Sequence, residues 1–245
     1  MKYRDLGKTG ERVSALGFGA MRLPTYPDRG DEIDEPAVTE MLRYAVDHGV
    51  NYIDTAYVYH SGKGEGVVGK ALADGYREKV LLATKLPIWN VARRGDCDRF
   101  LDEQLARLQT DRIDCYLLHC VQEKSWPKVR ELGVLDWAEQ ARADGRIGHF
   151  GFSFHDCYET FVEIVDGYDW SFCQIQYNYV NGDFEVFNNA TVFQGNTVAL
   201  CRNLYRSQPE PRRASACAQC GQCEERCPQQ IPVAEMLARV RQQFE

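Results

Sequence analysis

Apolar residues along the chain follow two alternating patterns, short continuous runs and longer stretches with helical spacing. In the stretch 36–48, Val38, Leu42 and Ala45 lie on one face, with a proline at its start and a glycine just after its end. Runs such as 80–85 have the length of a strand. The two patterns alternate at intervals of about 30 residues, which predicts repeated strand–helix units.

Six runs are predicted to be strands, after an N-terminal hairpin over residues 2–13. They are continuously apolar, as expected of parallel strands that helices bury on both faces. The predicted strands cover 13–18, 51–55, 80–85, 113–119, 147–153 and 172–177. The predicted helices cover 36–48, 134–143 and 159–165, with two more around 67–72 and 101–108.

Repeated units of this kind build either a doubly wound sheet or a (β/α)8 barrel of the TIM type. A doubly wound nucleotide-binding sheet should carry the spacing G-x-G-x-x-G after its first strand. Gly17 and Gly19 begin such a spacing, but Arg22 stands where the third glycine is required. The sequence therefore favours an α/β fold of the barrel type.

The pattern ends after the sixth predicted strand, where residues 181–200 have no helical face. Two further units would need about 60 residues, so we expect an incomplete barrel of about six units. The expected domains are a barrel over 1–180, an irregular linker over 181–200 and a segment over 201–245 that ends in a helix. The open barrel edge calls for cover by a second copy of the chain, by the linker or by the tail.

Four of the ten cysteines form a run near the C-terminus, Cys217-x2-Cys220-x2-Cys223-x3-Cys227, followed by a proline. This is the spacing of bacterial ferredoxins, and it predicts a 4Fe-4S cluster. A structural zinc site would have two cysteine pairs separated by about a dozen residues or more. The fourth cluster ligand is either Cys227 or the more distant Cys201.

Composition narrows the class of protein. The chain has 245 residues, 44% of them hydrophobic and 27% charged, so it can form a sizeable core. The net charge is -7 and no basic block is present, which speaks against nucleic-acid or anionic-membrane partners. No apolar run is long enough to span a membrane, and the polar N-terminus does not resemble a signal peptide. We expect a cytoplasmic protein.

Four chemically active residues follow the ends of neighbouring predicted strands. Asp54 and Tyr59 come from the end of the second strand and its loop, Lys85 ends the third, and His119 ends the fourth. The C-terminal ends of barrel strands meet at one mouth, where barrel enzymes have their active sites. A single buried histidine or strand-end lysine is more often structural, but four such residues on three consecutive strands indicate a catalytic site.

The segments around these residues resemble the aldo/keto reductase family over about residues 2–180. The matching segments are LGFGAMRLP, IDTAYVY, GEGVVGKAL, LLATKLP, IDCYLLH, GHFGFSFH and CQIQYNY. The tail CAQCGQCEERCPQQIP is similar to the ferredoxin-type extension of one subgroup of that family. The resemblance implies NADPH-linked reduction of a small aldehyde or ketone to an alcohol on a (β/α)8 barrel, with a 4Fe-4S cluster beside it.

The resemblance also implies roles for individual residues. Tyr59 is the proton donor, Lys85 stabilises its phenolate form, Asp54 holds Lys85 in place, and His119 orients the carbonyl. The residues implied in cofactor binding are Gly19, Ala20, Met21 and Asp54, with Ser153 and Gln174 at the nicotinamide carboxamide. In many relatives an asparagine follows the serine, whereas this chain has Phe154.

The chain departs from the family where the seventh and eighth strands, whose loops bind the cofactor phosphates, would follow residue 179. Three interpretations stay open: a reductase with an auxiliary cluster, a non-catalytic electron-transfer or structural protein that serves a redox partner, or the product of an internally deleted gene. The four residues at the barrel mouth favour the first, and the missing strands favour the others.

Overall fold

The computed structural model describes residues 1–175, 210, 214–222 and 233–244. These residues belong to two compact units. The first unit comprises Met1–Phe154 with Glu163–Gln174, and the second comprises His155–Val162 with Ile175–Glu245.

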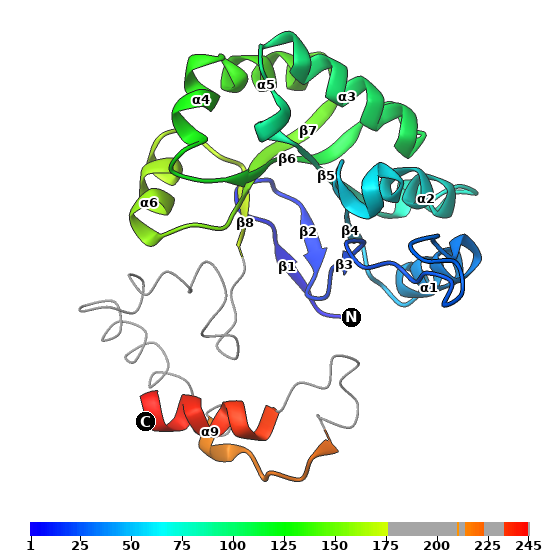
Figure 1. The fold of residues 1–245 in the computed structure, drawn as a ribbon, viewed down its shortest axis with the longest axis vertical. Helices are drawn as coiled ribbons and strands as arrows, with labels where there is room; N and C mark the ends of the chain where they lie inside the picture. The colour runs from blue at the N-terminus through cyan, green and yellow to red at the C-terminus, as the bar shows by residue number, and fades with distance from the viewer. Residues whose placement is uncertain (176–209, 211–213, 223–232, 245) are drawn as a thin grey trace. The chain divides into compact units, whose positions relative to one another are not determined.

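The first unit is built on a six-stranded parallel sheet in which the strands follow chain order. Its strands are β3 (Phe18–Gly19), β4 (Tyr52–Asp54), β5 (Leu81–Leu86), β6 (Ile113–Val121), β7 (Ile147–Phe154) and β8 (Phe172–Ile175). Figure 1 shows this sheet curled into part of a barrel with helices on its outer side. The prediction of an incomplete (β/α)8-like barrel is therefore confirmed.

Five helices of this unit cover the sheet: α1 (Glu35–Asp47), α2 (Gly64–Ala71), α3 (Gly95–Leu108), α4 (Trp126–Glu131) and α5 (Val134–Ala143). The α1 helix illustrates how the sequence sets its limits. The side chain of Asp34 accepts a hydrogen bond from the backbone N–H of Ala37, and Val38, Leu42 and Val46 form the buried face. The short α4 helix was not predicted, and α6 (Tyr158–Asp166) corresponds to the predicted helix 159–165.

The first predicted strand is the one whose limits were wrong. Residues 12–14 instead form β2 (Arg12–Ser14), which pairs with β1 (Tyr3–Asp5) as an antiparallel hairpin. The hydroxyl of Ser14 then donates to the carbonyl oxygen of Leu16, and Leu16 is 62% exposed. This turn interrupts the apolar run, so the barrel strand β3 begins only at Phe18.

The hairpin packs against one end of the curled sheet. Leu6 contacts a buried cluster formed by Ala83, Cys115, Leu117 and Phe172 of the barrel strands. Next to it, Gly7 has φ +51°, and a Cβ atom at this position would lie 2.4 Å from the carbonyl oxygen of residue 171. A glycine is therefore required where the hairpin meets the sheet.

The second unit includes the short helix η5 (Ala214–Ala216), residues 217–222 and the helix α9 (Val233–Phe244). The predicted C-terminal helix is confirmed by α9. The predicted linker 181–200, and Cys201, Cys223 and Cys227, lie outside the described residues. Within the described part of the chain, no helix has the length and hydropathy needed to cross a membrane.

Candidate active site

A buried lysine is at the centre of the site. Nζ of Lys85 donates to Oδ2 of Asp54 at 2.7 Å and to the carbonyl oxygen of Thr55 at 2.8 Å, and it lies 3.4 Å from the hydroxyl of Tyr59. The Lys85 side chain is only 2% exposed. An ammonium group is tolerated at such a position only with a charged and hydrogen-bonded partner, which Asp54 and Thr55 provide.

Strand register explains why these residues meet. In β4, β5 and β6, alternate residues point to the inside of the barrel, and Lys85 pairs with Leu117 of β6 while Asp54 pairs with Ala83 of β5. Lys85 and His119 are thus the inward positions that follow the core residues Ala83 and Leu117 along their strands. The four predicted catalytic residues are brought together at the C-terminal ends of β4, β5 and β6.

The imidazole of His119 contacts two aromatic rings, that of Tyr59 and that of Trp89, a residue that the sequence analysis missed. The ring centroids of His119 and Tyr59 are 5.9 Å apart in an edge-on arrangement, and those of His119 and Trp89 are 4.9 Å apart. Trp89 is 48% exposed, so it adds an apolar surface beside the imidazole. Its position four residues after Lys85, just beyond the end of β5, was the signal that could have identified it.

An irregularity in β6 follows His119. Cys120 has φ 55°, and the pairing of β6 with β7 shifts between Leu118 and Val121. The hydroxyl of Ser153 on β7 accepts the backbone N–H of Cys120 at 2.8 Å and donates to the carbonyl oxygen of Leu118 at 3.4 Å. Ser153 therefore holds the strand on both sides of the histidine.

Three buried polar atoms near the strand ends have no hydrogen-bond partner among the described residues: Oδ1 of Asp54, Oγ1 of Thr55 and Oε1 of Gln174. Leaving a buried polar atom unsatisfied costs about 1–3 kcal/mol, so such atoms often mark a site that a ligand completes. Ala20 is close to Asp54, since its backbone N–H donates to the carbonyl oxygen of Asp54 at 2.7 Å. These residues fit a polar ligand that offers hydroxyl and amide donors, as a nicotinamide nucleotide does.

A buried polar network supports β5 from outside the barrel. The amide nitrogen of Gln104 donates to Glu65 at 2.7 Å and to the carbonyl oxygen of Lys85 at 3.1 Å, and the hydroxyl of Thr84 donates to Glu65 at 2.6 Å. Tyr116 donates to the amide oxygen of Gln104 at 2.6 Å. Burial raises the pKa of the Glu65 carboxyl, and the hydrogen bonds from Thr84 and Gln104 oppose this effect.

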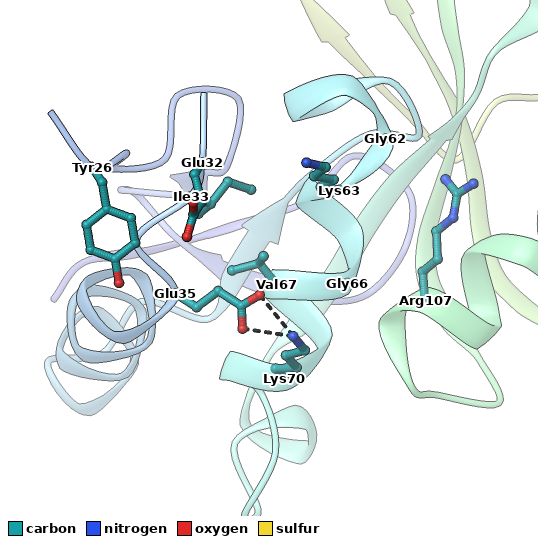
Figure 2. A pocket seen from close by; sticks show the side chains of 10 residues that line it. All are labelled: Tyr26, Glu32, Ile33, Glu35, Gly62, Lys63, Gly66, Val67, Lys70 and Arg107. Carbon is teal, nitrogen blue, oxygen red and sulfur yellow. Dashed lines mark hydrogen bonds and ion pairs between the residues drawn. The ribbon is translucent and has the colours of Figure 1, made fainter. Parts of the chain in front are cut away.

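The described residues also form a pocket of about 570 Å³ on the outside of the barrel, beside α2. Figure 2 shows Lys70 directed toward Glu35, and its ammonium group donates to both carboxylate oxygens at 2.9 and 2.8 Å. None of the predicted site residues lines this pocket. The ion pair satisfies both of these groups, so we do not assign the pocket a role in the chemistry.

The described part of the cysteine run contains two ligand candidates. Cys217 is half-buried, Cys220 is exposed, and both are free thiols. Gln219 and Gly221 have φ values of 52° and 76°, so the chain turns sharply on either side of Cys220. Within residues 1–175, 210, 214–222 and 233–244, no group of three or more potential metal ligands is present. Thiolate donors in a tight loop fit an iron–sulfur cluster.

Comparison with known proteins identifies the family. Residues 15–202 match the model of the aldo/keto reductase family, and residues 175–232 match that of a 4Fe-4S dicluster domain. The first match covers more than half of the chain, and the protein therefore belongs to the aldo/keto reductase family. The predicted resemblance, including the ferredoxin-type tail, is confirmed.

Three relatives illustrate the extent of the similarity. The uncharacterized oxidoreductase YrpG of Bacillus subtilis (strain 168) is 34% identical in a 172-residue alignment that covers 62% of this chain and 49% of the relative. Aldo-keto reductase AKR11C1 from Bacillus halodurans (holo form) has a TM-score of 0.60 with 29% identity, over 72% of this chain and 58% of that one. An aldo-keto reductase from Klebsiella pneumoniae in complex with NADPH has a TM-score of 0.62 with 26% identity, over 83% and 65%.

The matched part of this chain corresponds to 49% of YrpG and 38% of a second curated relative, the aldo-keto reductase YhdN of Bacillus subtilis (strain 168). The chain thus spans about half the length of the curated relatives it matches, or less.

Proposed function

We propose that the protein is an NADPH-dependent oxidoreductase that reduces the carbonyl group of an aldehyde or ketone to an alcohol and carries an auxiliary 4Fe-4S cluster. The observation that supports this most directly is the buried chain from Asp54 through Lys85 to the hydroxyl of Tyr59, with His119 beside the phenol. A buried cation beside the phenol favours its phenolate form, which is what a proton-donating tyrosine needs.

Tyr59 donates its phenolic proton to the carbonyl oxygen as negative charge develops there. Lys85, held by Asp54 and by the carbonyl oxygen of Thr55, stabilises the phenolate that remains. Because the Lys85 side chain is buried, water screens this interaction little. His119 orients the substrate oxygen toward the phenol. The nicotinamide, when bound, supplies the hydride.

The unpartnered atoms would hold the cofactor. Oδ1 of Asp54 and Oγ1 of Thr55 offer acceptors for hydroxyl groups, and Oε1 of Gln174 offers one for a carboxamide N–H. The hydroxyl of Ser153 accepts one hydrogen bond from the backbone of β6 and donates one to it. Its second lone pair remains available to accept a hydrogen bond from the same carboxamide. Gly19, Ala20 and Met21 would lie beside the ring.

The rim of the site favours an apolar substrate. Met21, Val58 and Trp89 follow β3, β4 and β5, and they are 58%, 36% and 48% exposed. An aromatic aldehyde or a quinone would place its ring against Trp89 and its oxygen between Tyr59 and His119. We therefore propose a flat, apolar carbonyl compound as the substrate class.

The cluster would be held by Cys217, Cys220, Cys223 and Cys227, with Cys201 as the alternative to Cys227. The match of residues 175–232 to a 4Fe-4S dicluster domain favours a second candidate function, in which the cluster transfers electrons to a redox partner or stabilises the tail and the barrel residues no longer catalyse.

The decisive experiment uses cluster-loaded protein purified without oxygen. We expect saturable NADPH binding and NADPH oxidation with an aromatic aldehyde, and Tyr59→Phe should lower kcat by about 100-fold or more. The exposed Tyr44→Phe on α1 is the matched control. An unchanged rate in Tyr59→Phe would show that another group donates the proton. Reversible cluster reduction without carbonyl turnover would favour the second function.

A further inference from the structure

The turn that carries Tyr59 has an unfavourable backbone conformation. His60 and Ser61 have φ values of 51° and 55°, and Gly62 follows at 84°. Left-handed conformations are sterically costly for residues with a Cβ atom. Two such residues directly after the proposed proton donor therefore require a compensating interaction.

A hydrogen bond from another loop provides it. The backbone N–H of Leu23 donates to Nε2 of His60 at 2.9 Å, between residues 37 positions apart. Since a backbone N–H can only donate, Nε2 has to be the unprotonated nitrogen, and the imidazole is neutral with its proton on Nδ1. The side chain of Leu23 is only 5% exposed, so packing also holds this end of the loop.

The loop that follows β3 is thereby held at two points. The N–H of Ala20 donates to the carbonyl oxygen of Asp54 at 2.7 Å, and the N–H of Leu23 donates to His60. Met21 lies between these two anchors and is 58% exposed. The segment 20–23 is thus tied both to the end of β4 and to the turn of Tyr59.

We propose that His60 is a positioning residue. By accepting the N–H of Leu23, it keeps the Tyr59 turn and the segment 20–23 in one relative arrangement, so that the proton donor and the loop proposed to lie beside the nicotinamide stay aligned. The catalytic consequence rests on the proposed carbonyl reduction, whereas the hydrogen bond and its effect on the loop can be measured without turnover.

Two substitutions separate the hydrogen bond from the backbone conformation. His60→Gln can bring its amide oxygen close to the place of Nε2, whereas the side chain of His60→Asn is one methylene shorter. Asparagine tolerates the left-handed conformation better than most residues. Reduced protection of the Leu23 amide or a lower kcat in His60→Asn would therefore not result from backbone strain at residue 60. His48→Gln, at the exposed end of α1, makes the same chemical change elsewhere and is the control.

The first readout is amide hydrogen exchange followed by NMR. Exchange at Leu23 should be about tenfold faster in His60→Asn than in the wild type, and close to wild type in His60→Gln and His48→Gln. In the wild type, a nitrogen-15 spectrum should show an imidazole with its proton on Nδ1, and this signal should vanish in His60→Gln. The second readout is kcat with an aromatic aldehyde, which should fall about tenfold in His60→Asn and recover in His60→Gln.

Each contrary result has its own meaning. Equal amide exchange at Leu23 in the wild type and in His60→Asn would show that the hydrogen bond from Leu23 to His60 does not protect this amide, and would overturn the proposal. Faster exchange with unchanged kcat and KM would overturn the positioning role. A wild type that protects Leu23 but reduces no carbonyl compound would overturn the proposed function and, with it, any catalytic effect of His60.

Discussion

Lys85 is the residue on which the site depends most. Its ammonium group is buried, and Asp54 is its charged partner at 2.7 Å. Removing one member of a buried ion pair leaves the other uncompensated, whereas removing both charges is often tolerated. The pair therefore allows catalysis and stability to be separated by experiment.

Lys85→Met should abolish measurable reduction and lower the free energy of unfolding by about 3–5 kcal/mol. The double variant Lys85→Met with Asp54→Asn should recover much of the stability but none of the activity, because the phenolate loses its cation in both cases. Urea unfolding and NADPH oxidation measure the two quantities. If the double variant is no more stable than Lys85→Met, the pair is not coupled as the structure indicates.

Two buried thiols of the barrel, Cys97 and Cys115, should differ in reactivity from the exposed Cys220 of the cysteine run. Burial raises the pKa of Cys97 to about 12, and burial also raises the pKa of Cys115 strongly. Cys220 is exposed. In native, cluster-free protein, iodoacetamide should label Cys220 and leave Cys97 and Cys115 unmodified, as mass spectrometry of peptides would show. Rapid labelling of Cys115 would mean that the barrel opens readily.

Among the structural elements, the β1–β2 hairpin closes one end of the sheet. Gly7→Ala should destabilise the protein by about 1–3 kcal/mol, because the new Cβ atom would meet the carbonyl oxygen of residue 171 at 2.4 Å. Gly10→Ala is the matched control, since Gly10 also has positive φ, 77°, but has open space around it. If thermal unfolding shows that Gly7→Ala and Gly10→Ala lose equal stability, the backbone conformation alone is responsible and the contact with residue 171 is not.

We expect the contact of α2 and α3 with β5 to depend on pH through Glu65. Its pKa is raised in the folded chain, chiefly by burial, so the folded chain keeps a proton at pH values where the unfolded chain has released it. Stability from this residue is therefore greatest below the ordinary glutamate pKa and decreases as pH rises through the folded value. Urea unfolding at several pH values should show this decrease in the wild type and not in Glu65→Gln. If the free energy of unfolding changes with pH in the same way in the wild type and in Glu65→Gln, Glu65 is not the cause of the decrease.

At the scale of the whole molecule, the chain joins a partial barrel to a tail with a ferredoxin-type cysteine run. We expect Cys220→Ser to lose the brown absorbance and the bound iron of the tail, because a thiolate ligand is replaced by a weak one. If the cluster is auxiliary, carbonyl reduction by the first unit should continue. Unchanged colour would exclude Cys220 as a ligand. Loss of both the cluster and carbonyl reduction would show that the cluster takes part in turnover.

Much of this organisation was predictable. The strand order, the incomplete barrel and the meeting of Asp54, Lys85 and His119 follow from local spacing, because every parallel βα unit places its strand end at the same mouth. The limits of the first strand were not predictable, since the hydrogen bond from Ser14 to Leu16 interrupts an apolar run that looks continuous.

The sequence by itself determined the βα rhythm, the chemistry available at the strand ends and the thiolate run of the tail. Only the tertiary structure decided that Ser153 holds the strand around His119, that Trp89 lies against that imidazole, and that His60 accepts the N–H of Leu23. The reason is physical: helix and strand signals arise between near neighbours in the chain. These three contacts join different strands and loops, so they exist only after the strands have paired in register.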